Sequence, residues 1–247
     1  MSARVWDDVR PLVELHHEAI ALTSLGHRGG LAATRRPVTV RDLVDDAERA
    51  LDARGLERPH VAGNSLGGWM AIELARRGRA RTVCALSPAG SWTAGTEEQA
   101  AGVRKIRRAF RLARLSPLPA PVLMQSAAAR RLTLRDVARH GDRLLPTQAA
   151  EATRDLLACT VLDDLLRTGE QLAPLDPLPC PITLAWSGDD AILPVAVNGA
   201  IARTRLPRAR FEIIPGVGHV PMIDDPAGVA RAILATTQRS ASAPEAA

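Results

Sequence analysis

The chain alternates short apolar runs with segments of helical periodicity. Five runs rich in β-branched residues or alanine predict buried strands, at residues 19–25, 60–64, 82–87, 182–187 and 211–214. Between them lie segments such as 40–54, whose apolar residues fall on one helical stripe. Strands that alternate with helices are typical of a parallel sheet, so we predict an α/β fold.

The alternation stops between residues 91 and 171. This stretch contains amphipathic helical segments and no run that is typical of a strand. We therefore predict a core made of residues 1–90 and 172–237, with a helical cap inserted at 91–171. Residues 238–247 are small or polar and lack periodicity, which predicts a disordered tail.

One predicted cap helix is strongly basic. Val103, Ile106, Phe110 and Ala113 form its apolar stripe, and cations occupy most of its remaining surface: Arg104, Lys105, Arg107, Arg108, Arg111 and Arg114. A charge run of this kind is most often a solvated face. The alternative is an electropositive lid over a pocket, which would favour anionic substrates.

Composition excludes several functional classes. The 247 residues are 46% hydrophobic and 24% charged, which is ordinary for a globular domain with a full core. Aromatic residues make up only 2%, so base-stacking nucleic-acid modules have little to build with. The net charge of +5 comes from scattered arginines rather than from one basic patch, and we expect no nucleic-acid partner.

The cysteines and the apolar runs bear on location. Three cysteines, without metal-ligand spacing, argue against a disulfide framework or a structural zinc site and fit a reducing compartment. No apolar run approaches the roughly 18 residues of a membrane span, and no secretory leader stands at the N-terminus. We expect a cytoplasmic protein with no membrane partner; the sequence leaves its oligomeric state open.

A G-x-S-x-G motif stands where a predicted strand meets a predicted helix. Ser65 lies in the run Gly-Asn-Ser-Leu-Gly-Gly, at the turn that a nucleophile elbow requires. Gly63 and Gly67 are expected to leave room for the closely approaching backbone. The N–H of Leu66, at the positive end of the following helix, would stabilise an oxyanion.

A serine nucleophile needs a histidine base and an acid that orients it. Two further predicted strands run into loops that carry these groups: Asp189 and Asp190 after residue 187, and His219 after residue 214. The order Ser65, Asp190, His219 is the chain order of an α/β-hydrolase triad.

These motifs together resemble the α/β-hydrolase fold family. The resemblance rests on Gly-Asn-Ser-Leu-Gly-Gly, Asp-x-Ile-x-Pro and Gly-x-Gly-His-x-Pro, and it spans most of the chain. It implies Ser65 as nucleophile, His219 as general base and acid, and Asp190 as orienting carboxylate, because only Asp190 has the family's Ile and Pro spacing after it. It implies a serine hydrolase of esterase type acting on a small-molecule ester or thioester, without metal or organic cofactor.

The chain also departs from the family pattern. Residues 23–30 are similar to the family's Asp-x-x-Gly-His-Gly loop, but Ser24 replaces the acid and Arg28 interrupts the glycines; we expect a structural role for His27. No segment is similar to the first three strands and the His-Gly loop that supplies a second oxyanion donor. We therefore expect a functional protein longer than this sequence, and either a gap in the sheet or direct pairing of 19–25 with 60–64.

Alternatives remain open. Asn64 beside the nucleophile resembles hydrolases that cleave carbon–carbon bonds, and an acyltransferase would differ only in excluding water. A catalytically impaired or non-enzymatic remnant of the fold is the alternative from another class. We expect structural roles for the remaining histidines, which are His16, His17, His60 and His140. The acids before Pro226, Asp224 and Asp225, are expected to cap the last helix.

Overall fold

The computed structural model describes residues 2–115 and 119–240. Most of the predicted tail, residues 241–247, lies outside the described residues. The last helix ends at Gln238, where that tail was predicted to begin.

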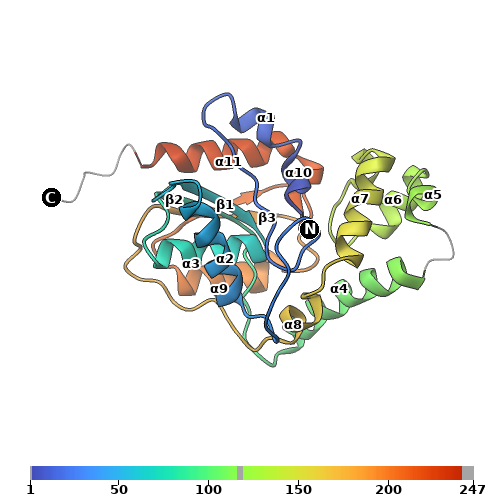
Figure 1. Ribbon diagram of the computed structural model, residues 1–247, viewed down its shortest axis with the longest axis horizontal. Helices are drawn as coiled ribbons and strands as arrows, with labels where there is room; N and C mark the ends of the chain where they lie inside the picture. Colours follow the sequence, from blue (N-terminus) through green and yellow to red (C-terminus); the bar gives the residue numbers. More distant parts are fainter. Residues whose placement is uncertain (1, 116–118, 241–247) are drawn as a thin grey trace.

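A parallel sheet forms the centre of the molecule (Figure 1). Its four strands are β1 (His60–Asn64), β2 (Thr82–Leu86), β3 (Ile182–Ser187) and β4 (Arg210–Ile214), in the order β1-β2-β3-β4. Four of the five predicted strands are therefore confirmed, as is the α/β fold class.

The two central strands are buried on both faces, which explains their nearly continuous apolar sequence. Successive side chains point to opposite faces of a strand. Val83 and Leu184 accordingly belong to one core cluster, whereas Cys84 and Ala185 belong to a second cluster on the other face. The sheet thus separates two hydrophobic cores.

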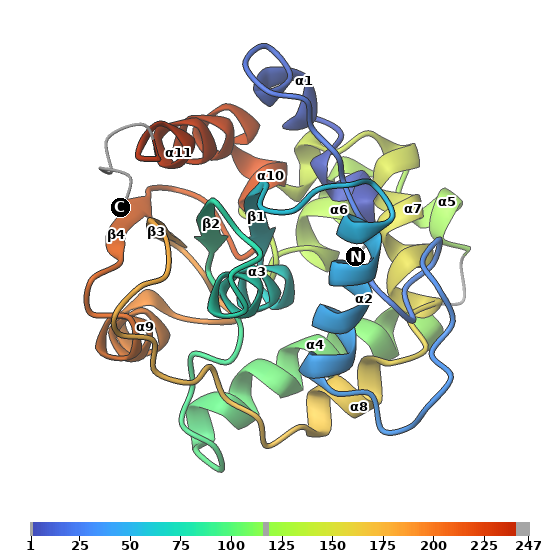
Figure 2. The ribbon, with the colours of Figure 1, turned by 60° about the vertical axis from the view of Figure 1, so that its left-hand side comes forward.

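Helices cover both faces (Figure 2). On one face lie α2 (Val40–Asp52), α3 (Leu66–Arg76) and α9 (Ala200–Arg205), which pack in the first cluster. On the other lie α1 (Arg10–Val13) and α11 (Pro226–Gln238). Short turns complete the core: a 3-10 turn at Ala3–Trp6, a π-helical turn at Val195–Gly199 and α10 (Pro221–Asp224).

The helices between β2 and β3 project to one side of the sheet (Figure 1). They are α4 (Glu97–Leu115), α5 (Ala120–Leu123), α6 (Ala127–Thr133), a 3-10 turn at Gly141–Arg143, α7 (Pro146–Leu157) and α8 (Leu162–Arg167). Met124, Ala149 and Ala150 give them a small core of their own. We call residues 91–171 the insertion; its role as a substrate cap stays a prediction.

Arg205 on α9 holds both ends of the insertion. Its guanidinium donates to the carbonyl oxygens of Gly90 at 2.6 Å and Trp92 at 2.7 Å, where the insertion begins. It also donates to Oε1 of Gln171 at 2.6 Å, where the insertion ends. Burial lowers the pKa of Arg205. One core side chain therefore fixes the place from which the insertion projects.

The predicted strand at 19–25 is wrong. These residues have no regular secondary structure, and Ile20 and Leu22 are 47% and 38% exposed. An apolar run becomes a strand only when a neighbour completes its hydrogen-bond ladder. Among the described residues no strand pairs with 19–25, so the direct pairing with β1, one of the two expected arrangements, does not occur and β1 is an outer strand.

Candidate active site

Ser65 occupies a strained turn between β1 and α3. Its φ of 55° and ψ of −115° lie in a region that residues other than glycine rarely adopt. The turn is held by two main-chain bonds, from Ser65 N to Leu86 O and from Ala89 N to Ser65 O, each 2.9 Å long. The serine is thereby fixed at the carboxyl end of β1.

The glycines around Ser65 differ in how much the turn needs them. A Cβ on Gly63 would lie 2.1 Å from the carbonyl oxygen of Gly67, which no side chain can tolerate. A Cβ on Gly68 would lie 3.2 Å from Pro88 Cα, whereas one on Gly67 would meet no atom within 4 Å. The expectation that Gly67 leaves room for the backbone is therefore corrected: Gly63 and Gly68 do so.

Leu66 is the first residue of α3. The first N–H groups of a helix have no partner within the helix, and the helix dipole adds positive potential at this end. The N–H of Leu66 is therefore placed next to Ser65 with its hydrogen-bonding capacity unused by the helix. This is the position at which an oxyanion donor is expected.

Asp190 and His219 are brought together from separate loops. His219 Nδ1 lies 2.8 Å from Asp190 Oδ2, and each residue is only 6% exposed. The other carboxylate oxygen of Asp190 accepts from the N–H groups of Ile192 at 2.9 Å and Leu193 at 2.7 Å. With Nδ1–H donating to Asp190, Nε2 is the ring nitrogen left to accept a proton.

Asp189, the competing acid, points elsewhere. Its carboxylate lies 3.4 Å from the guanidinium Nε of Arg139, and its side chain is 45% exposed. The acid that contacts His219 is therefore the one that the Ile and Pro spacing selects.

Asn64 connects the turn at Ser65 to residues 215–220, the loop that carries His219 and that we call the histidine loop. Its side-chain nitrogen donates to the main-chain oxygens of His219 at 2.9 Å and Leu86 at 3.3 Å. Among the described residues Ser65 makes no side-chain hydrogen bond to His219. Such bonds are often long until substrate is bound.

One of the two acids before Pro226 does not cap the last helix as predicted. Asp225 caps α11 as expected, accepting from Gly228 N at 2.8 Å. Asp224 is instead buried and accepts hydrogen bonds from the main chain of Gly218, Arg139 and His140. Two adjacent acids before a proline give no signal of which one turns inward.

The insertion packs directly on residues 188–194, the loop that carries Asp190 and that we call the acid loop. A Cβ on Gly102 of α4 would lie 2.9 Å from Ile192 O, so the helix approaches this loop at a glycine. Lys105, on the next part of α4, donates to the carbonyl of Ala191. The basic helix therefore borders the loop that carries Asp190.

Three other histidines have local partners. His17 Nε2 lies 3.0 Å from Thr237 Oγ1, and His60 Nδ1 lies 2.8 Å from Thr82 Oγ1. Burial, followed by the neighbouring His17 and Arg81, lowers the pKa of His60. His27 Nδ1 lies 3.2 Å from Leu25 O, and burial lowers its pKa.

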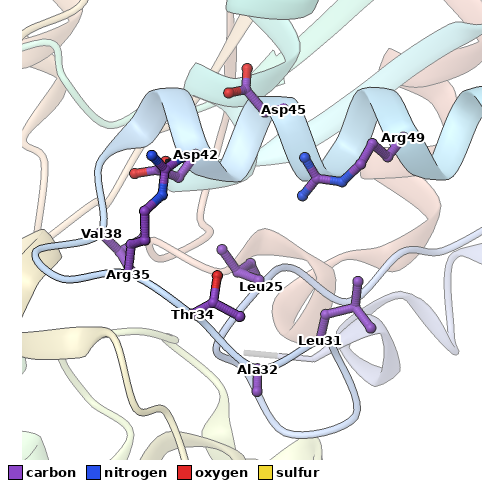
Figure 3. A pocket seen from close by; sticks show the side chains of 9 residues that line it. All are labelled: Leu25, Leu31, Ala32, Thr34, Arg35, Val38, Asp42, Asp45 and Arg49. Atoms are coloured by element: carbon purple, nitrogen blue, oxygen red, sulfur yellow. Dashed lines mark ion pairs between the residues drawn. The ribbon is translucent and has the colours of Figure 1, made fainter.

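A hollow of about 300 Å³ lies between α2 and the loop that precedes it (Figure 3). Its apolar floor includes Leu25 and Leu31, and its rim carries charged groups. These are already paired: Arg35 with Asp42 at 3.6 Å, and Asp45 with Arg77 at 2.6 Å. A second hollow of about 470 Å³ adjoins it, and neither is lined by Ser65, Asp190 or His219. We assign no ligand to either hollow.

Within residues 2–115 and 119–240, no group of three or more His, Cys, Asp or Glu side chains has an arrangement that could hold a metal ion. No helix in the same part of the chain is both long and apolar enough to cross a membrane.

Comparison with known proteins identifies similar chains. The model of the alpha/beta hydrolase family matches residues 1–232. The chain is 29% identical to the epoxide hydrolase EphH of Mycobacterium tuberculosis over 195 residues, which cover 77% of this chain and 91% of that protein. It is also 29% identical to the putative carbamate hydrolase RutD of a Caulobacter species over 229 residues, 84% of this chain and 77% of the relative.

Solved structures share the fold at lower identity. A thermophilic esterase from Thermogutta terrifontis has a TM-score of 0.69 at 22% identity, covering 97% of this chain and 86% of the esterase. A meta-cleavage product hydrolase from Pseudomonas fluorescens has a TM-score of 0.69 at 18% identity, covering 97% of this chain and 86% of the hydrolase.

Proposed function

Because the chain belongs to the alpha/beta hydrolase family, we propose that it is a serine hydrolase that cleaves a carboxylic ester or thioester of a small molecule. The observation that carries the proposal is the 2.8 Å contact between His219 Nδ1 and Asp190 Oδ2. It leaves Nε2 of His219 as the proton acceptor, while Asn64 ties the same loop to the turn that holds Ser65.

The proposed reaction has two halves. His219 Nε2 takes the proton of Ser65 as its Oγ attacks the substrate carbonyl, and the N–H of Leu66 stabilises the oxyanion. His219 then protonates the leaving alcohol or thiol, which departs and leaves an acyl group on Ser65. Water, deprotonated by His219, releases the acid and restores the serine. Asp190 orients the imidazole and stabilises its cationic form, so the reaction needs no metal or organic cofactor.

Epoxide hydrolysis is disfavoured by the nucleophile. The family branch that opens epoxides carries an aspartate at the elbow, which forms an ester that water can cleave. A serine that opened an epoxide would form an ether, and nothing in this triad could hydrolyse an ether. Ser65 therefore favours acyl transfer, although one similar chain is an epoxide hydrolase.

Carbon–carbon bond hydrolysis is the second candidate, on the strength of Asn64 and of the similar meta-cleavage product hydrolase. The Asn64 amide already donates to two main-chain carbonyls, which accounts for an asparagine here without a role in substrate binding. An acyltransferase remains the third. Adding an alcohol or thiol acceptor to an ester assay separates it, because an acyltransferase would form the new ester faster than the free acid.

Reaction of the purified chain with a fluorophosphonate probe tests the proposal. We expect labelling of the wild-type protein, localised to Ser65 by peptide mass spectrometry, and none in Ser65→Ala. The matched control is Ser240→Ala, two residues after the last helix ends, which should be labelled like the wild type. A folded wild-type protein that the probe does not label would overturn the proposal and favour a non-catalytic member of the fold.

A further inference from the structure

Asp224 lies where the histidine loop meets the insertion. Its carboxylate is 2% exposed and accepts three main-chain hydrogen bonds. Oδ2 accepts from Gly218 N at 2.8 Å and from Arg139 N at 2.9 Å, and Oδ1 accepts from His140 N at 2.7 Å. A buried carboxylate is costly unless such donors surround it, so this arrangement strongly favours one geometry.

Both residues that flank His219 contact the same part of the insertion. On one side, a Cβ on Gly218 would lie 2.9 Å from Ala138 Cα, so the two backbones touch. On the other side, Val220 N donates to Val137 O at 2.7 Å. The histidine loop and residues 137–140 are therefore packed and hydrogen-bonded together, and the Asp224 carboxylate accepts hydrogen bonds from both segments.

We propose that Asp224 is a positioning residue for His219, and that the same carboxylate fixes the position of the insertion relative to the histidine loop. This inference rests on the proposed function, in which His219 is the base. The carboxylate does not touch the reacting atoms. It fixes the main chain on the N-terminal side of His219, while Asp190 fixes the ring. Removing it releases the loop and the insertion together.

The test compares Asp224→Asn with Asp225→Asn. The first replacement puts an amide N–H₂ among three N–H donors and leaves at least one of them unpaired. The second changes the neighbouring acid in the same way but keeps the cap of α11, because asparagine caps a helix as well as aspartate does. Circular dichroism first establishes that each variant is folded. If Asp224→Asn is not folded, Asp224→Glu takes its place, since it keeps the charge but lengthens the side chain.

The first readout is fluorophosphonate labelling per folded molecule across pH 5–9. Displacements of about 1 Å cost up to roughly a hundredfold in rate, so we expect a tenfold or greater loss in Asp224→Asn and a changed pH profile. Asp225→Asn should label at the wild-type rate. Equal rates and profiles for Asp224→Asn and the wild type would overturn the inference, since a merely structural acid alters only the folded fraction.

The second readout does not depend on activity. Two-dimensional ¹H–¹⁵N spectra of the histidine rings, with His219 assigned from its loss in His219→Gln, report which ring nitrogen carries the proton. We expect Nδ1–H in the wild type and in Asp225→Asn, and a shifted or mixed pattern in Asp224→Asn. If the wild type resists the probe while Asp224→Asn still shifts these signals, the proposed function fails and the positioning role stands. Unchanged His219 signals in Asp224→Asn would overturn the positioning role.

Discussion

The side-chain amide of Asn64 donates a hydrogen bond of 2.9 Å to the main-chain oxygen of His219. The residue before the proposed nucleophile is thereby attached to the residue that is proposed to activate it. The same nitrogen reaches Leu86 O, at the end of the next strand, so three chain segments meet at one amide. Their relative placement depends on an N–H donor at residue 64, which an aspartate of the same shape lacks.

Replacing Asn64 with aspartate keeps the shape and removes that donor. An aspartate would face two carbonyl oxygens with a carboxylate, so we expect a free energy of unfolding lower by roughly 1–3 kcal/mol. We also expect fluorophosphonate labelling per folded molecule to fall by about tenfold or more, because the Ser65 turn and His219 separate. Chemical denaturation and labelling kinetics measure the two effects. Labelling at the wild-type rate would contradict the inferred link.

The two adjacent aspartates offer a matched pair. Asp190→Asn should lower the rate of ester hydrolysis by about 10⁴, because an amide no longer selects the ring tautomer in which Nε2 accepts the proton. Asp189→Asn, which disturbs only a half-exposed contact with Arg139, should retain the wild-type rate within about twofold. Steady-state kcat for both variants decides the assignment. A large loss in Asp189→Asn alone would place the acid one residue earlier.

The glycines of the turn should respond in opposite ways to alanine. Gly63→Ala would drive a methyl group into the carbonyl of Gly67, so we expect a destabilised protein with a distorted turn. Gly67→Ala places its methyl group in open space within α3 and should raise the free energy of unfolding by up to about 1 kcal/mol. Thermal denaturation of the two variants tests this. A lower Tm in Gly67→Ala than in Gly63→Ala would be incompatible with the turn geometry.

The parts that the sequence predicts well are those with local signals. The central strands are buried on both faces, so most of their residues are apolar. The proposed acid and base each follow such a strand within a short motif, and parallel strands bring their carboxyl ends to one edge of the sheet. The contact between Asp190 and His219 could therefore be anticipated from order and spacing.

The parts that it predicts poorly depend on neighbours distant in sequence. Residues 19–25 have the composition of a strand, but a strand also needs a partner, and no pattern within the run reveals whether one exists. Asp224 turns inward because Arg139 and His140, over 80 residues away, bring their N–H groups to it. The need for Gly68 arises from its close approach to Gly63 O in the same turn and to Pro88, which belongs to another segment.

The basic face of α4 is partly neutralised. Arg104 pairs with Glu97, Arg108 pairs with Asp136, and Lys105 donates to the acid loop. In the part of the chain that the structure describes, no acidic side chain forms an ion pair with the other cations of this helix, which are Arg107, Arg111 and Arg114. These three arginines therefore give α4, the helix that borders the loop carrying Asp190, a positive electrostatic potential that no ion pair among the described residues offsets.

We expect this potential to favour anionic esters over neutral esters of the same shape. Raising the ionic strength from about 0.01 M to 0.15 M shortens the Debye length from about 30 Å to 8 Å, so the preference in kcat/KM should fall. Changing Arg107, Arg111 and Arg114 together to glutamine should abolish it. The control changes the exposed Arg41, Arg54 and Arg58 and removes the same charge away from α4. Equal turnover of both esters at low salt would contradict the expectation.

Asp155 on α7 joins the insertion to the N-terminal segment. Its carboxylate, 3% exposed, accepts from Ser2 Oγ and Arg4 at 2.5 Å and from Arg28 at 2.6 Å. Burial acts to raise the pKa of Asp155, but these hydrogen bonds outweigh it and the pKa is lowered. Arg28, which interrupts the expected glycine pattern, also pairs with Glu151. The irregular loop at residues 23–30 is thus anchored to the insertion.

The lowered pKa of Asp155 predicts how the protein responds to acid. A carboxyl group whose pKa is lower in the folded state stabilises that state above its ordinary pKa of about 3.9 and loses the contribution as pH falls through the lower, folded value. Asp155→Asn should therefore be less stable than the wild type by about 1.5–3 kcal/mol at pH 7, with the difference shrinking below pH 4.

Asp8→Asn, at an exposed position, serves as the control. Thermal denaturation from pH 7 to pH 3 measures the difference. Because the ionised carboxylate is what holds Ser2, Arg4 and Arg28, a difference in Tm as large at pH 3 as at pH 7 would mean that packing, rather than charge, anchors the insertion here.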